Sequence, residues 1–280
     1  MVKIGQYNLM KVLKEKPMGV FLDDGQSGIL LPKRFVPPGT KVGDTLKVFL
    51  YHDSEDRVIA TTQEPYGVLG DLVKLKAVSV GPQGAFLDWG LMKDLLLPSS
   101  RQVSFIRKGG EYLVKIMMDE KTGRLYATEK IDAFLSNKNI EVHEKAIVDL
   151  IVYRKTDLGF VVIINNKHTG LLYFNELFRP LQPGDRLTGF IKKIYPPNEQ
   201  GDCLIDVGVG KPGYERVAGE EKKILALLQE ANGYLPYHDK SSPEEIYAVF
   251  GMSKKTFKMT IGKLYKERKL DITESGIKLL

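Results

Sequence analysis

The chain has 280 residues, of which 43% are hydrophobic and 27% charged, with a formal net charge of +6 and a pI near 9.1. This length exceeds the needs of one ordinary domain, and the composition is too hydrophobic for a disordered chain. No apolar run approaches the roughly 18 residues of a membrane span, and the N-terminus shows no signal peptide. We therefore expect a cytoplasmic, multidomain protein with no membrane partner.

The residues that bind metals or form disulfides are few. Cys203 is the only cysteine, which excludes an intrachain disulfide and paired thiolate ligands. The histidines have no ligand-like spacing and are expected at the surface or in turns; they are His52, His143, His168 and His238. No Walker sequence, glycine-rich nucleotide motif or carboxylate cluster is present. We expect no metal, no cofactor, no catalytic residue and no enzymatic activity.

One pattern of short strands occurs three times. It is anchored on Gly19, Gly84 and Gly159, each of which begins an alternating strand. A short apolar strand, a turn, a longer strand and a final strand follow each glycine. With the strand before the glycine, each repeat has five strands. Because a flat sheet of five such strands would leave open edges, each repeat is predicted to close into a small barrel.

After the repeats the apolar spacing changes from two residues to about 3.6, which indicates helices. The first helix follows Gly219 and ends at Gly233. The second begins at Ser242 and the third at Ser253, because both serines are good N-caps. A short hairpin over Ile272–Leu279 completes the pattern. This order of elements is typical of a winged helix-turn-helix domain.

The expected fold is therefore mainly β, with three tandem five-stranded barrels and a C-terminal α+β winged helix-turn-helix domain. Weakly patterned segments near Pro65, at 137–144 and at Gly208–Gly213 mark the boundaries. The predicted domains are 1–65, 66–140, 141–213 and 214–280.

In the first two repeats, the strand that begins at the anchoring glycine has an aromatic residue at an outward position. Ala85 and Leu87 can fill the barrel core only if Phe86 and Asp88 point outward, and Phe21 has the same place in the first repeat. An exposed ring suits stacking on a nucleic-acid base, which contributes roughly 1 to 3 kcal/mol. The alternative is that a neighbouring domain covers these rings.

These motifs, glycine–x–Phe–aliphatic–Asp and then glycine–Leu–Leu–aromatic, resemble the S1-type RNA-binding domain of the oligonucleotide-binding (OB) fold. The resemblance implies an RNA surface made of the exposed Phe, an aromatic residue or His in the next strand, and an Asp and an Arg near the last hairpin. The corresponding residues here are Phe21, Asp53 and Arg57 in the first repeat, Phe86, Asp119 and Arg124 in the second, and Tyr173 in the third.

The repeats also depart from the family pattern. Leu31 and Leu97 stand where the family usually has His. In the third repeat Val161 replaces the Phe, and Asp202 stands roughly where the Arg would be. Each barrel is therefore expected to be a partial RNA site, and high affinity would require several barrels acting together.

Basic residues gather in the third predicted helix, where seven Lys and Arg side chains stand against one Glu between Met252 and Leu270. Phe257, Ile261 and Leu264 form the stripe expected to be buried. The basic faces of this helix are predicted to contact phosphates. The alternative is that these lysines are only solvated and bind nothing. The residues concerned are Lys254, Lys255, Lys258 and Lys266.

Three degenerate S1-type repeats followed by a winged helix resemble the conserved virulence factor B family of bacterial proteins over essentially the whole chain. That resemblance implies a non-catalytic RNA-binding protein with post-transcriptional influence on gene expression. The expected partner is single-stranded RNA. Duplex nucleic acid at the winged helix, and the ribosome or other RNA-associated proteins, are further candidates. Two alternatives stay open: a DNA-binding winged-helix transcriptional regulator, and a ribosome- or polymerase-associated scaffold.

Overall fold

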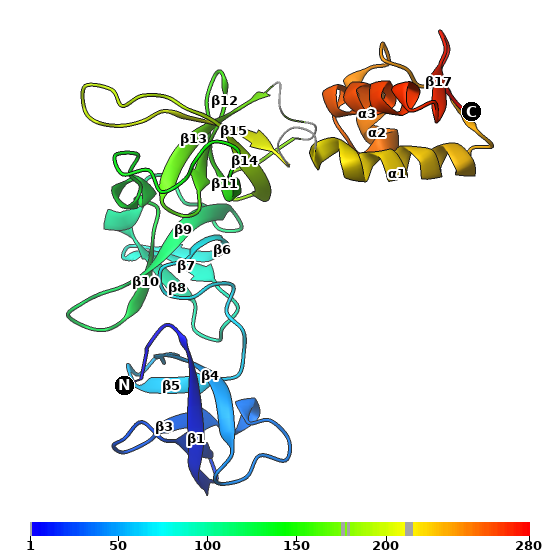
Figure 1. Ribbon diagram of the computed structural model, residues 1–280. Helices are drawn as coiled ribbons and strands as arrows, with labels where there is room; N and C mark the ends of the chain where they lie inside the picture. Colours follow the sequence, from blue (N-terminus) through cyan, green and yellow to red (C-terminus); the bar gives the residue numbers. More distant parts are fainter. Residues whose placement is uncertain (1, 175–176, 178–179, 211–214) are drawn as a thin grey trace. The chain divides into compact units, whose positions relative to one another are not determined.

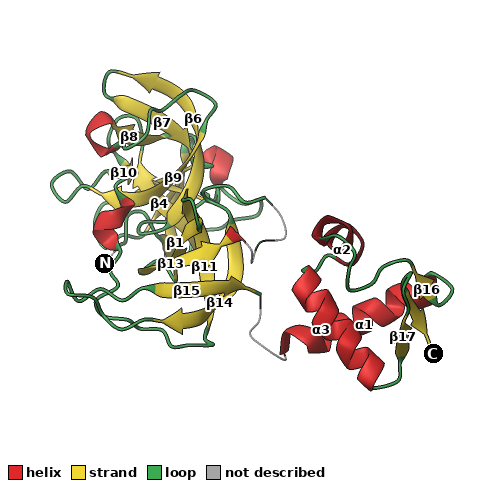
Figure 2. Cartoon of the chain, turned by 90° about the horizontal axis from the view of Figure 1, so that it is seen from above, coloured by secondary structure: helices red, strands yellow, loops and turns green. Residues whose placement is uncertain are grey.

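The computed structural model describes residues 2–174, 177, 180–210 and 215–280. The chain falls into two compact units, Met1–Phe134 and Leu135–Leu280. The first unit contains two five-stranded sheets, and the second contains a third such sheet and a helical domain (Figures 1 and 2). No helix within the described ranges is long and apolar enough to cross a membrane.

The first sheet closes into a barrel with the strand order β1-β2-β3-β5-β4. Alternating side chains fill its interior, among them Val20 and Leu22 of β2 and Leu31 of β3, which are all buried. The only parallel pairing joins β3 to β5, where Leu30 lies opposite Ile59. The strands are β1 (Tyr7–Lys16), β2 (Gly19–Leu22), β3 (Ile29–Pro32), β4 (Thr45–His52) and β5 (Val58–Thr61).

The second sheet repeats this plan with the order β10-β9-β6-β7-β8. Its two outer strands, β8 and β10, lie side by side, so the barrel is nearly closed. The strands are β6 (Leu72–Gly81), β7 (Gly84–Asp88), β8 (Leu95–Pro98), β9 (Glu111–Met118) and β10 (Leu125–Thr128).

The third sheet is again a closed barrel, with the order β11-β12-β13-β15-β14. Its core includes His168, which is buried. The Nδ1 atom of His168 lies 2.6 Å from the carbonyl oxygen of Ser136, and its Nε2 atom accepts from the amide of Glu141 at 3.3 Å. The expectation that every histidine lies at the surface or in a turn is therefore wrong, since backbone groups satisfy this buried ring. The strands are β11 (Ile147–Lys155), β12 (Gly159–Ile164), β13 (His168–Tyr173), β14 (Arg186–Ile194) and β15 (Ile205–Val209).

The glycine that begins the second strand of each barrel is required by close approach of the next strand. A Cβ atom on Gly19, Gly84 or Gly159 would lie 2.1, 2.2 or 2.1 Å from a backbone carbonyl oxygen of that strand. No side chain fits at such a distance. This contact explains why glycine marks all three repeats.

The C-terminal domain is a winged helix, with three helices and the small sheet β16-β18-β17. Ser242 and Glu245 form a capping box, Gly251 adopts the left-handed conformation that ends the helix, and Ser253 accepts from the amide of Thr256 at 2.9 Å. The elements are α1 (Glu215–Glu230), β16 (Tyr234–Leu235), α2 (Pro243–Phe250), α3 (Lys254–Lys266), β17 (Leu270–Ile272) and β18 (Ile277–Leu279).

The predicted architecture of three five-stranded barrels and a winged helix is confirmed. The strands of each barrel fall within the predicted ranges 1–65, 66–140 and 141–213. Residues 211–213 of the third predicted boundary lie outside the described residues, and the domain limits stay predictions.

Candidate nucleic-acid interface

The aromatic rings of the second strands point away from the barrel cores, as predicted. Phe86 in β7 is 37% exposed, whereas its neighbours Ala85 and Leu87 are buried. Phe21 in β2 is half-buried, and the Nζ atom of Lys14 lies 5.0 Å from its ring centroid. Both rings therefore lie on the outer faces of their barrels, and the Phe21 ring is partly covered by Lys14 of the neighbouring strand β1.

The residues that lie beside these two rings on the next strand are one position away from Leu31 and Leu97, which the family pattern predicted there. Phe21 pairs with Leu30, and Phe86 pairs with Leu96. Leu31 and Leu97 are fully buried in the barrel cores. Their assignment to the positions of a surface histidine is therefore wrong, because a shift of one residue along a strand moves a side chain to the opposite face.

The third barrel presents tyrosines at the corresponding surface. Tyr173 is half-buried at the end of β13, opposite Gly159, and Val161 pairs with Leu171. Tyr195 follows β14, and its hydroxyl donates to Oδ2 of Asp206 at 3.0 Å. This hydrogen bond raises the pKa of Tyr195, and Tyr173 lies close enough to add to the effect. Tyr195 was not predicted as a site residue, because its only signal in the sequence is its place directly after a strand.

In the first barrel, Asp53 and Arg57 shape the hairpin between β4 and β5. Oδ1 of Asp53 accepts from the amides of Glu55 and Arg57 at 2.9 and 3.0 Å. Oδ2 accepts from Nε and Nη2 of Arg57 at 3.0 and 2.7 Å. Partial burial opposes ionisation, but the hydrogen bonds from Arg57 and the loop amides bring the pKa of Asp53 below its usual value. The carboxylate is thus occupied within its own loop, while the Arg57 side chain is largely exposed.

The other two barrels have the same kind of hairpin. Oδ1 of Asp119 accepts from the amides of Lys121 and Thr122 at 3.1 and 2.8 Å. In the third barrel Oδ1 of Asn198 accepts from the amides of Gln200 and Asp202 at 3.0 and 2.9 Å. Asn198 is therefore the third member of this set, and it was not among the predicted site residues. The repeated Asp, Asp and Asn side chains form the turns, so their first role is to position the residues around them.

The second hairpin also connects the second barrel to the first. Arg124 forms an ion pair with Asp56 of the first hairpin. Nζ of Lys93 donates to the carbonyl oxygen of Asp53 at 2.7 Å. Two basic residues of the second barrel therefore engage the end of the first.

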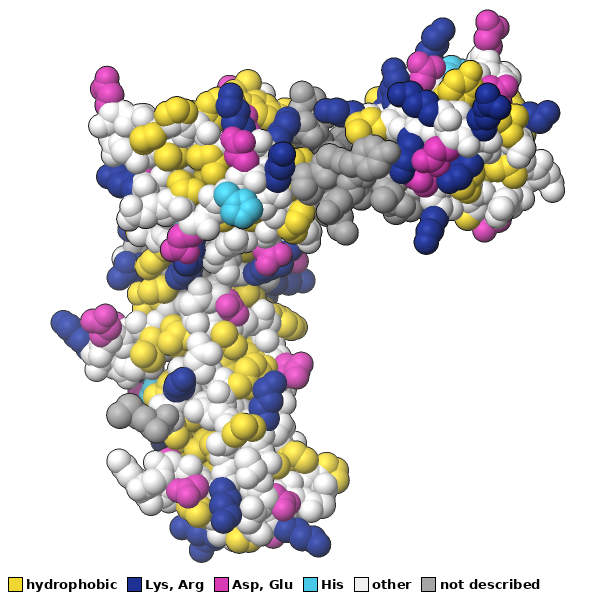
Figure 3. All heavy atoms as spheres, in the orientation of Figure 1, with side chains coloured by type: hydrophobic (Ala, Val, Ile, Leu, Met, Phe, Trp, Pro, Cys, Tyr) yellow, Lys and Arg dark blue, Asp and Glu magenta, His cyan; other side chains and the backbone are white. Residues whose placement is uncertain are grey.

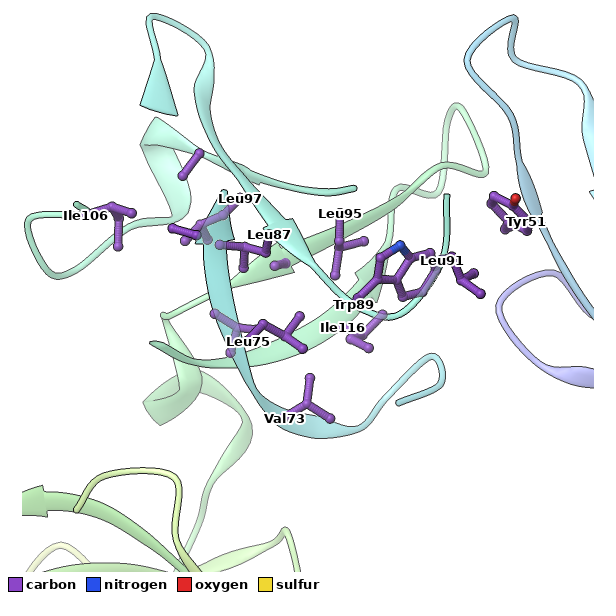
Figure 4. Close-up of a cluster of buried hydrophobic side chains, with 14 of the residues drawn as sticks. Tyr51, Val73, Leu75, Leu87, Trp89, Leu91, Leu95, Leu97, Ile106 and Ile116 are labelled. Atoms are coloured by element: carbon purple, nitrogen blue, oxygen red, sulfur yellow. The ribbon is translucent and has the colours of Figure 1, made fainter. Parts of the chain in front are cut away.

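Beneath these contacts the first two barrels share the hydrophobic core of the second, which extends onto Phe49, Tyr51 and Ile59 of the first (Figure 4). The interior of the first barrel forms a separate cluster. Trp89 is only 2% exposed, and its ring centroid lies 5.7 Å from that of Phe49 and 6.3 Å from that of Tyr51, both in β4. Its Nε1 donates to the carbonyl oxygen of Lys93 at 2.6 Å. Met1–Phe134 is therefore one packed unit made of two barrels.

A cavity of about 340 Å³ opens on the outer face of the second barrel, where it meets the first. It brings together three of the predicted site residues, Phe86, Asp119 and Arg124. The first barrel adds Tyr51 and His52, which were not among the predicted site residues. The predicted residues Phe21, Asp53, Arg57 and Tyr173 do not line this cavity.

The winged helix carries the predicted lysines on α3. Lys255, Lys258 and Lys266 are exposed and Lys254 is half-buried. Nζ of Lys258 lies 3.5 Å from Oδ2 of Asp239. The predicted apolar stripe, Phe257, Ile261 and Leu264, is buried. Basic side chains gather on the visible face of this domain (Figure 3).

Two known domain families match separate domains of the chain. Residues 4–63 match the S1 domain family, and residues 222–279 match the family described as the CvfB-like winged helix domain. Conserved virulence factor B of Staphylococcus aureus is 27% identical over 248 residues, which cover 85% of this chain and 80% of that protein. The chain is a homologue of the conserved virulence factor B proteins. The predicted family resemblance is confirmed.

Two further relatives extend over nearly the whole chain. An uncharacterized protein of Bacillus subtilis, YitL, is 26% identical over 95% of this chain and 90% of its own length. A crystal structure from Streptococcus pneumoniae, described as a multidomain protein with nucleic acid binding domains, is 22% identical. The match covers 99% of this chain and 98% of that one, with a TM-score of 0.44.

The S1 and winged-helix families matched here are nucleic-acid-binding domains, and they indicate nucleic-acid binding by this homologue of conserved virulence factor B. Neither family indicates a catalytic activity. In the part of the chain that the structure describes, no three His, Cys, Asp or Glu side chains are grouped so that they could hold a metal ion.

Proposed function

We propose that this protein binds single-stranded RNA without catalysis, in the cytoplasm, and thereby influences gene expression after transcription. The observation that carries the proposal is the exposed ring of Phe86, which stands on the outer face of a barrel and lines a cavity there. A ring placed there offers a face on which a base can stack, and stacking tolerates any base because every base has a π face.

The residues around Phe86 favour binding of single-stranded RNA over binding of a duplex at the barrels. Phe21 holds the same position as Phe86 in the first barrel. In the third barrel Tyr173 stands on β13, two residues beyond the partner of Val161. Arg57 and Arg124 are paired with carboxylates of the hairpins but remain more than half exposed, which makes them candidates for phosphate contacts. Asp53 and Asp119 hold those hairpins in shape. An aromatic side chain can stack on the face of a base only when that base is unpaired. Such stacking therefore favours single-stranded over duplex nucleic acid.

The lysines of α3 are proposed to add contacts to phosphates. The predicted partners include duplex nucleic acid at this domain, and the ribosome or other RNA-associated proteins. A DNA-binding regulator would bind duplex DNA more tightly than single-stranded RNA through α3. A scaffold would retain its protein partners after nuclease treatment. One binding assay with both nucleic acids, and one pull-down with and without nuclease, separate these classes.

Phe86→Ala should weaken binding of single-stranded RNA by about 1 to 3 kcal/mol, because a stacking ring is lost. Thermal stability should hardly change, since the ring lies on the outer face of the barrel and is not part of its core. Fluorescence anisotropy of a labelled RNA measures the first effect and circular dichroism melting the second. Phe21→Ala should act in the same direction with a smaller effect. A large loss of stability in Phe86→Ala would make the ring a structural residue and remove the basis of the proposal.

Replacing Lys255 and Lys266 together by Ala should flatten the salt dependence of binding. Each lost phosphate contact lowers the log–log slope by about 0.7 for single strands and 0.9 for duplex DNA, because fewer counterions are released. Titrations at several salt concentrations measure the slope. The matched control is Lys222→Ala with Lys223→Ala, which removes the same charge from exposed positions of α1. Equal slopes in the two double variants would show that the α3 face is only solvated.

A further inference from the structure

The cavity between the first two barrels has walls from both of them. Phe86, Trp89 and Tyr126 line it from the second barrel, and Tyr51 and His52 line it from the end of β4 in the first. Its volume of about 340 Å³ falls in the range of pockets that hold small organic molecules. Aromatic rings from both barrels stand beside aliphatic walls such as Leu95 and Leu96, so the cavity favours a flat, aromatic ligand.

Polar groups of the cavity could pair with the edge of such a ligand. Nδ1 of His52 is buried, and it has no hydrogen-bond partner among the described residues. A buried polar atom without a partner is costly, and a bound ligand can satisfy it. Burial, followed by the charge of Lys93, lowers the pKa of His52, so its ring is neutral at pH 7 and one nitrogen can accept while the other donates.

Charged groups also line the cavity and suit the remaining parts of a nucleotide. Asp94 lines the wall, and burial followed by the nearby Asp88 raises its pKa. Lys93 and Arg124 add positive charge. A nucleobase with its attached phosphate matches this combination of aromatic walls, hydrogen-bonding groups and cations.

We propose that this cavity holds one unstacked nucleobase of a bound RNA strand, and that Tyr51 and His52 of the first barrel complete the site of the second. The inference rests on the RNA binding proposed above and adds where one base is held and which barrels hold it. The first two barrels then act as a single binding site, in addition to sharing a core.

Trp89 provides a direct readout, because it is the only tryptophan of the chain and lines the cavity. The full-length protein is titrated with an oligoadenylate of about ten nucleotides, a length within the span of one OB fold. A second titration uses an oligomer of equal length and charge with abasic riboses. Trp89 emission is recorded with unlabelled oligomers, and affinity is measured separately by competition against a labelled RNA.

We expect the oligoadenylate to change Trp89 emission with the same midpoint as its binding curve, and the abasic oligomer to leave the emission unchanged. Phe86→Ala should weaken oligoadenylate binding about 5- to 150-fold and abasic binding less than about twofold. Phe21→Ala is the matched control: Phe21 has the same place in its own barrel but does not line the cavity, so the emission response should persist.

His52→Ala tests the contribution of the first barrel. It should weaken oligoadenylate binding by about fivefold or more, and His52→Asn, which keeps a hydrogen-bonding group, should restore part of the affinity. If oligoadenylate binds while Trp89 emission stays constant, or if the abasic oligomer binds equally well, the cavity holds no base and the inference is overturned while RNA binding stands. If neither oligomer binds, the proposed function fails as well.

Discussion

Trp89→Ala is expected to destabilise the first unit by about 3 to 5 kcal/mol, the usual loss for a large aromatic side chain in a core. The indole contacts Phe49 and Tyr51 across the boundary between the barrels, so its removal opens a void in the core that they share. Unfolding by urea, followed by circular dichroism, measures the loss.

The form of the unfolding curve should change as well. With Trp89 in place we expect the two barrels to unfold together, because one core joins them. Trp89→Ala should separate the curve into two transitions. Trp89→Phe is the control, since it keeps an aromatic ring while losing the hydrogen bond to the carbonyl oxygen of Lys93 and a smaller part of the buried volume. A loss below about 1 kcal/mol in Trp89→Ala would mean that each barrel is stable alone.

Gly84→Ala should destabilise the second barrel by about 2 to 4 kcal/mol. The backbone at Gly84 has a φ of 142°, and a Cβ atom would lie 2.2 Å from the carbonyl oxygen of Leu97. The strands must therefore move apart or the residue must be strained. Thermal unfolding of the full-length protein provides the measurement.

Gly81→Ala is the matched control in the same pair of strands. Gly81 pairs with Gly84, yet no heavy atom lies within 4 Å of the position of its Cβ. Its replacement should change the free energy of unfolding by less than about 0.5 kcal/mol. Equal effects at the two glycines would show that the recurrent glycine is not explained by the close approach of the neighbouring strand.

Much of the fold could be predicted because its determinants are local. The recurring glycine reflects a backbone contact, and the helix ends depend on serines and glycines with defined capping geometry. The shared core of the first two barrels was missed. Its signal is the run Val48–Tyr51, in which every residue is buried, because a strand covered on both faces loses its alternation.

The candidate site was less accessible to sequence reasoning. Leu30 and Leu31 are adjacent leucines, so composition alone cannot tell which of them faces outward; the register of the strands decides it. Similarly, the sequence identified Asp119 and Arg124 but not their partners. Those partners are backbone amides in one case and Asp56 of another barrel in the other, and both depend on tertiary structure.

The shared core of the first two barrels also limits how this chain can be cut, duplicated or recombined. Losing either barrel would leave Trp89 or Phe49 facing water, and such a surface favours aggregation. The smallest N-terminal segment that can be gained, lost or grafted onto another protein as a stable piece is therefore the pair. An amino-acid substitution on the side of β4 that packs against the second barrel requires a compensating substitution around Trp89. These two surfaces are therefore expected to vary together among relatives.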